Sequence, residues 1–383
     1  MNRKELVDNS KILVIKVGSS LLFNSTGLSQ KRLEELASNI NSIIQTGKKV
    51  VLVTSGAVAC GRNVLGDKLN RDDIPLKQAL SAVGQGFLIH RYQEAFSGFS
   101  LPVAQILLAP EDVHFRSKYL NARNTFETLF DLGVVPIVNE NDTVAVEEIK
   151  FGDNDRLSAL VASLVQADLL IILSDVAGLM DRDPRMFSDA KLIPEVKEIN
   201  STIEEMAGGP GSEVATGGMK SKILAAKIAT FSGTGVVIAS GNNFDVLKEI
   251  MAGKEEGTFF FPQKRFLNSR KRWIAFGTIS QGEVWIDEGA KDALLSGKSL
   301  LPVGVRKVVG SFDVGDCVSI FDQVGNRIGK GIVNYSFWEL KKISGKQSWE
   351  IGKFLEKDHN QQEVIHADNL VLLMGEREND RTN

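Results

Sequence analysis

The sequence predicts an α/β protein: an open three-layer αβα sandwich around a mostly parallel sheet, followed by a small β-rich domain. Two observations predict this fold. Between residues 11 and 251, short β-branched apolar runs alternate with segments of helical periodicity, as in strand–helix–strand units. After residue 272 the pattern changes to short strands separated by turns. Since 383 residues exceed one typical domain, we expect two domains.

The first domain is expected to span residues 1–265. Its predicted strands cover residues 11–17, 49–53, 103–108, 134–138, 169–173 and 235–240, and its predicted helices cover residues 29–46, 75–97, 119–132, 157–165, 220–231 and 245–251. Ser29 is a predicted N-cap of the first of these helices. Gly84 and Gly86 are expected to interrupt the second. The strand at 103–108 is expected at an edge, and the one at 235–240 is expected to be the last of the domain.

The second domain is expected to span residues 274–375, within the normal size of a domain. Its predicted strands cover residues 282–287, 303–305, 317–321, 329–334 and 370–373, and two short helices are expected at 290–296 and 336–343. The Phe run at 259–261 and the basic segment at 270–272 fall near the expected boundary.

Composition excludes several classes of protein. A net charge of −3 gives no support for a surface that binds polyanions along the whole chain. The two cysteines, Cys60 and Cys317, lie far apart and predict neither a disulfide framework nor a zinc site. The polar start of the chain and the lack of a run of about 20 apolar residues predict a cytoplasmic protein with no signal peptide and no membrane span.

Lys16 and the loop after it form the first candidate site. Lys16 stands near the end of a predicted buried strand, and Gly18 begins the loop that follows. A lysine over a Gly-Ser loop can hold a phosphate with its charge and the backbone N–H groups, although a strand-end lysine can also reach solvent. The next strand ends at Ser55 and Gly56, small residues that let a carboxylate approach the backbone at a helix start.

The polar stretch between residues 139 and 155 is the second candidate site. It follows the strand at 134–138 and carries amides and carboxylates, among them Asn139, Asp142, Asn154 and Asp155. A polar loop between a strand and a helix is where open α/β sheets bind ligands. We expect residues 139–142 and 152–155 to bind, whereas the acidic segment 143–150 between them is a candidate flap or simply solvated.

A glycine-rich loop at residues 208–222 is the third candidate site. It leads into a helix that carries Lys222 in its first turns, so it presents N–H groups and a positive charge to a phosphate. Its spacing matches neither a P-loop nor a dinucleotide-binding motif.

Together these loops favour phosphoryl transfer. None of the four histidines lies in a loop with a candidate nucleophile, and the spacing of a zinc site is missing. Phosphoryl transfer needs charge neutralisation and little covalent help from the protein, and two lysines with two glycine loops can supply that charge. Mg²⁺ would accompany the nucleotide, with no metal site of the protein's own predicted.

The chain resembles the amino acid kinase family. The motifs that carry the resemblance occur in the family's order at residues 15–22 (IKVGSSLL), 53–62 (VTSGAVACGR), 120–125 (LNARNT), 138–145 (VNENDTVA), 151–162 (FGDNDRLSALVA), 173–185 (LSDVAGLMDRDPR) and 216–222 (TGGMKSK). Residues 282–305 resemble a PUA domain, a small β-barrel-like module. The resemblance implies the amino acid kinase fold for the first domain.

The resemblance also implies a reaction. The likeness is strongest to family members that use ATP and Mg²⁺ to phosphorylate the side-chain carboxylate of L-glutamate, giving L-glutamyl 5-phosphate in the first step of proline biosynthesis. Proline as a feedback inhibitor and a homo-oligomer, dimer or tetramer, are implied as well. By resemblance, the catalytic residues are Lys16, Lys222 and Asp155; the substrate-binding residues are Ser55, Gly56, Asp142 and Asn154; and the ATP-binding residues are Lys16, Gly18, Ser174, Asp175, Thr216, Gly217, Gly218, Met219, Lys220, Ser221 and Lys222.

Two alternatives stay open at this point. One is another member of the same fold that acts on aspartate, acetylglutamate, carbamate or UMP, against which the PUA-like domain argues. The other is a protein that chiefly binds RNA through that domain and the basic segment 270–272. Mild acidity and the lack of an aromatic-basic stripe make nucleic acid an unlikely partner.

Overall fold

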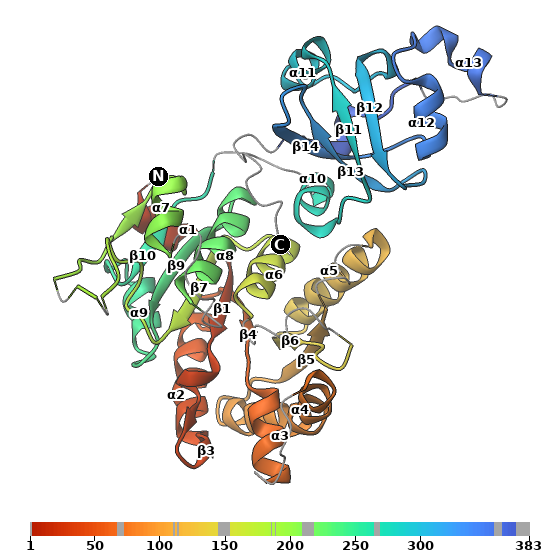
Figure 1. The fold of residues 1–383 in the computed structure, drawn as a ribbon. Coiled ribbons are helices and arrows are strands. Elements are labelled where there is room, and N and C mark those ends of the chain that lie inside the picture. The colour runs from red at the N-terminus through yellow and green to blue at the C-terminus, as the bar shows by residue number, and fades with distance from the viewer. Residues whose placement is uncertain are drawn as a thin grey trace. The chain divides into compact units, whose positions relative to one another are not determined.

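The computed structural model describes residues 2–66, 73–109, 112, 115–144, 154–184, 186–187, 189–208, 218–263, 269–355 and 362–372. The chain forms two compact units (Figure 1). One unit comprises Met1–Asp112 with Ser117–Phe266, and the other comprises Val113–Arg116 with Leu267–Asn383.

The first unit contains a mostly parallel sheet, as predicted. In the described part of the chain this sheet has eight strands in the order β5-β6-β4-β1-β7-β9-β10-β8. The strands are β1 (Ile12–Val17), β4 (Lys49–Val53), β5 (Val103–Leu108), β6 (Val135–Glu140), β7 (Leu169–Ser174), β8 (Glu195–Val196), β9 (Gly235–Ser240) and β10 (Thr258–Phe260). A small hairpin of β2 (Phe23–Asn24) and β3 (Gly27–Leu28) stands apart from it. β1 is central, between β4 and β7, and β5 is at an edge as expected.

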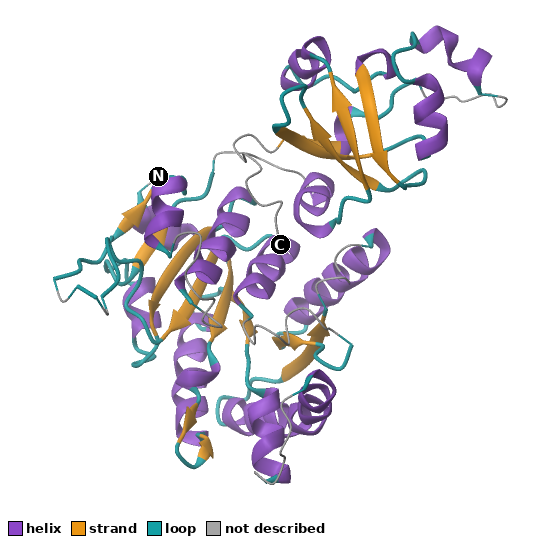
Figure 2. Ribbon diagram, in the orientation of Figure 1, coloured by secondary structure: helices purple, strands orange, loops and turns teal. Residues whose placement is uncertain are grey.

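Helices cover both faces of this sheet (Figure 2). They are α1 (Arg3–Asn9), α2 (Gln30–Ile44), α3 (Ala57–Leu65), α4 (Ile74–Ser97), α5 (Arg116–Asp131), α6 (Asp155–Val165), α7 (Ser201–Met206), α8 (Met219–Phe231) and α9 (Val246–Met251). One large core cluster joins α2, α4 and α9 to one face of β1, β4 and β7. α6 and α8 pack against each other on the opposite face.

The period of a strand places Lys16 on the face of α6 and α8. Leu13, Ile15 and Val17 of β1 belong to the cluster with α2, α4 and α9. Because successive side chains of a strand point to opposite faces, Lys16 points to the other side of the sheet. It is only 4% exposed, so it does not reach out to solvent as a strand-end lysine can.

The expected interruption of α4 at its glycines is wrong, because this helix is continuous from Ile74 to Ser97. Its glycines serve packing instead. A Cβ at Gly84 would overlap the Ala57 carbonyl oxygen and the Gly61 backbone nitrogen, so a glycine is needed where α3 and α4 touch. At Gly86 a Cβ would meet nothing within 4 Å.

This difference gives a matched pair of variants. Gly84→Ala should lower the free energy of unfolding by about 1–3 kcal/mol, because backbone must move to admit the methyl group. Gly86→Ala should raise it by up to about 1 kcal/mol, because alanine loses less entropy in a helix. Urea denaturation of both variants checks this, and equal effects at the two glycines would contradict the packing explanation.

Two boundaries also differ from the expectation. β9 is not the last strand of the unit, since β10 follows and pairs antiparallel with it. The Phe run supplies β10, and Phe259 and Phe260 are fully buried. Asn139 and Glu140 belong to β6 rather than to a loop, which holds Asn139 rigidly in the sheet. Ser29 does cap α2, since its hydroxyl accepts a hydrogen bond from the Arg32 N–H.

The second unit is β-rich, as predicted. Its described residues form a five-stranded sheet in the order β12-β11-β13-β14-β15. The strands are β11 (Gly282–Ile286), β12 (Val305–Gly310), β13 (Cys317–Phe321), β14 (Arg327–Ile332) and β15 (Leu370–Leu372), and the helices are α10 (Ser269–Arg272), α11 (Glu288–Leu295), α12 (Phe337–Ile343) and α13 (Ile351–Phe354). The unit has its own apolar core. In the described part of the whole chain, no helix is long and apolar enough to cross a membrane.

Candidate functional site

A buried carboxylate that bridges two lysines forms the centre of the site. Asp155, the first residue of α6, lies with Oδ1 2.6 Å from Lys16 Nζ and with Oδ2 3.0 Å from Lys222 Nζ. Asp155 is fully buried, and Lys16 and Lys222 are 4% and 3% exposed. Since two cations meet one anion, the three side chains together carry one positive charge away from bulk water. Such a group attracts an anion strongly.

Three elements far apart in the sequence build this bridge. β1 supplies Lys16, α6 supplies Asp155, and α8 supplies Lys222 from its first turns. The packing of α6 on α8, over the face of β1 that carries Lys16, brings the three side chains together. The sequence predicted each of the three as a site residue, and the structure places them in contact.

The start of α8 adds further donors to the lysine bridge. Gly218 is its N-cap and supplies no side-chain cap, so the first N–H groups of a 13-residue helix stay available to an anion. Ser221 Oγ lies 2.9 Å from Asp155 Oδ2 and 2.8 Å from the Gly218 carbonyl oxygen. Met219 and Lys220 stand in the first turn, and Lys220 is exposed. Thr216 and Gly217 lie outside the described residues.

Two further ATP-site candidates lie at the ends of the central strands. Ser174 ends β7, and its hydroxyl donates to Asp175 Oδ1 at 2.9 Å. Ser174 is buried, whereas Asp175 is exposed. Gly18 follows β1, and a Cβ built on it would lie 4.0 Å from Lys16 Nζ. β1 and β7 are parallel neighbours, so these residues share one edge of the sheet with Lys16.

A chain of amides lies next to the lysine bridge. Asn154, which directly precedes Asp155, donates from Nδ2 to Ser55 Oγ at 3.0 Å, to Asn139 Oδ1 at 2.8 Å and to the Thr54 carbonyl oxygen. Asn139 in turn donates to Gln85 Oε1 at 2.7 Å. All of these side chains are buried, so the network holds a strand end, a helix start and α4 in one arrangement.

Asp142 is held by the same helix. Ser81 of α4 donates to Asp142 Oδ2 at 2.6 Å, one turn before Gln85. Burial raises the pKa of Asp142, and the hydrogen bond from Ser81 offsets part of that rise. Sequence reasoning missed Ser81 and Gln85. Their signal was two polar residues four positions apart on the buried side of a helix, where apolar residues are the rule.

Gly56 needs its glycine. Its φ is +113°, in the left-handed region, and a Cβ there would lie 2.7 Å from the Phe23 ring. It is the N-cap of α3 without a side-chain cap, next to Ser55. This places free backbone N–H groups beside the amide chain. The remaining part of the second candidate site, residues 145–153, lies outside the described residues.

The described side chains do not form a metal cage of their own. No group of three or more His, Cys, Asp or Glu residues among them could hold a metal ion. Asp155 is already paired with two lysines. The donor set therefore fits a Mg²⁺ ion that is held mainly by the phosphates of a nucleotide, as Mg²⁺ commonly is.

Comparison with known proteins agrees with this site. The model of the amino acid kinase family matches residues 11–240, and that of the PUA domain matches residues 282–355. The glutamate 5-kinase of Dictyoglomus turgidum is 50% identical over 369 residues, covering 96% of this chain and 98% of the relative. That of Syntrophotalea carbinolica is 48% identical over 371 residues, covering 97% and 99%. That of Moorella thermoacetica is 48% identical over 370 residues, covering 96% and 97%.

These matches confirm the resemblance that the motifs predicted, for both parts of the chain. The first match contains all three residues of the lysine bridge, and it spans more than half of the chain. This chain belongs to the amino acid kinase family.

Proposed function

We propose that the chain transfers the γ-phosphoryl group of ATP to the side-chain carboxylate of L-glutamate, giving L-glutamyl 5-phosphate in the first step of proline biosynthesis. The observation that carries the reaction type is the buried bridge of Lys16, Asp155 and Lys222. The choice of glutamate is supported by the relatives that match almost the full chain, which are named glutamate 5-kinases.

The lysines would act on the moving phosphoryl group. In this reaction negative charge spreads over the phosphoryl oxygens, and a fixed positive charge in a dry site stabilises that charge. Lys16 and Lys222 approach from different elements, and Asp155 between them holds both ammonium groups in place. Asp155 also keeps two buried cations from repelling each other when no phosphate is bound.

The amide chain would hold the acceptor. Ser55 and the N–H groups that follow Gly56 can receive a carboxylate of glutamate, and Asp142 can pair with its ammonium. Asn154 lies between this region and Asp155, so the amino acid would be bound directly beside the lysines. Proximity of this kind lowers the entropic part of the barrier.

ATP would lie at the same edge of the sheet. Gly18, Ser174 and Asp175, with residues 216–222, are the proposed nucleotide contacts, and Thr216 and Gly217 enter on the family resemblance alone. Mg²⁺ would come with the nucleotide and would neutralise part of the phosphate charge. A cytoplasmic location, assembly into a dimer or tetramer, and inhibition by proline stay predictions from the same resemblance.

An assay that traps acyl phosphates as hydroxamates tests the proposal. With ATP and Mg²⁺, we expect product with L-glutamate and at least about 100-fold less with L-aspartate or N-acetyl-L-glutamate, because a site built to pair a charged ammonium rejects an analogue that lacks it. Absence of a glutamate-dependent product, or equal activity with N-acetylglutamate, would refute the proposed substrate.

Gln85 is expected to act through Asn139. Gln85→Leu removes the acceptor of the Asn139 amide, so Asn139 and Asn154 lose their fixed orientation. We expect KM for glutamate to rise about tenfold, the effect of one lost hydrogen bond in a buried network, with a smaller change in kcat. Gln85→Glu, which keeps the acceptor, should restore most of the affinity. An unchanged KM in the leucine variant would exclude this role.

The binding of glutamate should depend on pH through Asp142. Because burial raises the pKa of Asp142, this carboxyl takes up a proton at higher pH than an ordinary aspartate and then cannot pair with an ammonium. KM for glutamate should therefore rise as the pH falls toward the acid side, and Asp142→Asn should give a high KM without this limb. For stability the sign is the reverse. From the ordinary pKa of 3.8 up to the raised value, stability should fall as pH rises, since the folded state holds the extra proton.

A further inference from the structure

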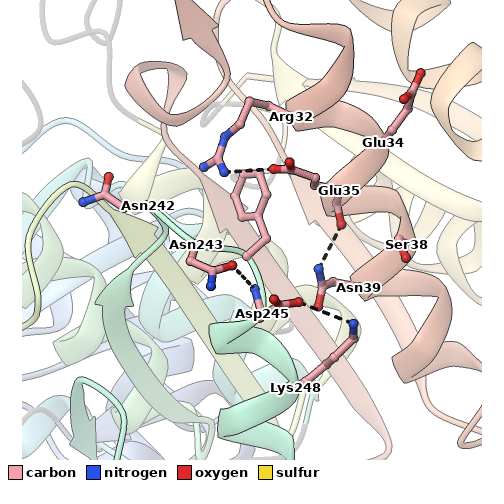
Figure 3. Close-up of a pocket in the computed structure, with 10 residues that line it drawn as sticks. Arg32, Glu34, Glu35, Ser38, Asn39, Asn242, Asn243, Asp245 and Lys248 are labelled. Atoms are coloured by element: carbon pink, nitrogen blue, oxygen red, sulfur yellow. Dashed lines mark hydrogen bonds and ion pairs between the residues drawn. The ribbon is translucent and has the colours of Figure 1, made fainter.

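A second cavity, separate from the kinase site, lies between α2 and α9 (Figure 3). Its volume is about 580 Å³, within the range of small-molecule pockets. The first half of α2, the loop 242–245 and Lys248 line it. α2 and α9 pack on the face of the sheet opposite α6 and α8, so the cavity does not share the lysine bridge.

Asn39 presents a buried acceptor in this cavity. Its side chain is 4% exposed and lines the cavity wall. Its Nδ2 donates to the Glu35 carbonyl oxygen at 2.9 Å, and this hydrogen bond determines which way the amide points. Within the described part of the chain, Asn39 Oδ1 then has no hydrogen-bond partner. Buried polar atoms are rarely left in this state, so a donor is missing from the site.

The cation nearest the loop is not available to a ligand. Arg32 donates to the carbonyl oxygens of Leu21 and Gly241 at 3.0 and 2.7 Å and to Glu35 Oε2 at 3.1 Å. Its guanidinium also lies 4.0 Å from the centre of the Phe244 ring. Arg32 is therefore a fixed wall of the cavity, with its donors directed into the protein.

The remaining charges favour a positively charged ligand. Three carboxylates line the cavity, on Glu34, Glu35 and Asp245, against the cations Arg32 and Lys248. Lys248 Nζ lies 3.4 Å from Asp245 Oδ1, and both side chains are about half exposed, so this pair is weak. Glu34 is exposed at the rim. The lining therefore has an excess of acceptors and of negative charge.

We propose that this cavity binds a small aliphatic amine, with one ammonium N–H donating to Asn39 Oδ1 and the positive charge balanced by the carboxylates of the lining. A single inorganic ion would leave most of 580 Å³ unfilled, whereas a diamine has the length to reach from the buried amide toward the rim. The proposal is independent of the reaction at the lysine bridge.

Calorimetric titration of the full chain with 1,4-diaminobutane tests the proposal. At constant ionic strength we expect saturable binding of one diamine per chain. Butane-1,4-diol, which has the same length and no charge, should bind at least about tenfold more weakly, because the carboxylates of the lining then meet no positive charge. Absence of saturable diamine binding, or equal binding of the diol, would overturn the proposal.

Two substitutions on one helix then locate the binding. Asn39→Leu keeps the size of the side chain and removes the acceptor, so it should weaken diamine binding about tenfold or more. Asn41→Leu makes the same change two positions away, outside the cavity lining, and should leave binding unchanged. If Asn39→Leu does not fold, Asp245→Asn removes a charge from the lining and should weaken binding in the same direction. Undiminished binding in the folded lining variant would place the amine elsewhere and refute the site.

Discussion

Lys222→Ala should lower kcat by about 10²- to 10³-fold, the usual effect of removing one electrostatic contact to a transition state. The ammonium of Lys222 is buried and held by Asp155 at 3.0 Å, so it is already in place before the reaction and needs no reorganisation. Its charge is needed most when charge develops on the moving phosphoryl group. KM for glutamate should therefore change much less than kcat.

Steady-state kinetics with both substrates varied checks this prediction. Lys227→Ala is the matched control, because Lys227 belongs to the same helix and pairs with Glu204 on the surface at 2.9 Å. We expect its kcat to equal that of the unmodified chain. If Lys222→Ala retains kcat, or raises only KM for glutamate, the proposed role in the transition state is wrong.

Asp155→Asn should damage both stability and activity. The substitution keeps the shape of the side chain but leaves the ammonium groups of Lys16 and Lys222 without the carboxylate that bridges them. Breaking a buried ion pair by removing one partner costs about 3–5 kcal/mol. The free energy of unfolding should fall by that order, and kcat should fall because the lysines are no longer held in position.

Denaturant titration and kinetics on the same preparation separate the two effects of this change. Asp131→Asn removes a carboxylate whose partner Lys49 lies 3.6 Å away on the surface, and it should alter neither quantity measurably. A second comparison is Asp155→Asn combined with Lys16→Met, which removes one of the stranded charges. The double variant should recover part of the stability and none of the activity. Full stability in the single variant would mean that the bridge does not hold the two lysines.

The sequence by itself was sufficient for the fold class and for most of the residues of the bridge. Strand and helix periods are local properties, and they correctly predicted β1, β4 and α8 within a few residues. Lys16 at the end of a strand and Lys222 after a glycine loop are local signals too. The order of the motifs along the chain identified the family.

Other features depend on which elements pack together, and no local pattern contains that information. The continuity of α4 through Gly84 follows from its contact with α3, whereas glycine alone suggested a break. Gln85 reaches Asn139 only because α4 packs beneath the end of β6. The pairing of both lysines with Asp155, and the unpartnered amide of Asn39 between α2 and α9, likewise arise from elements distant in sequence. Such long-range packing is decided by the summed burial of apolar surface over the whole unit, which is why only the tertiary structure reveals these contacts.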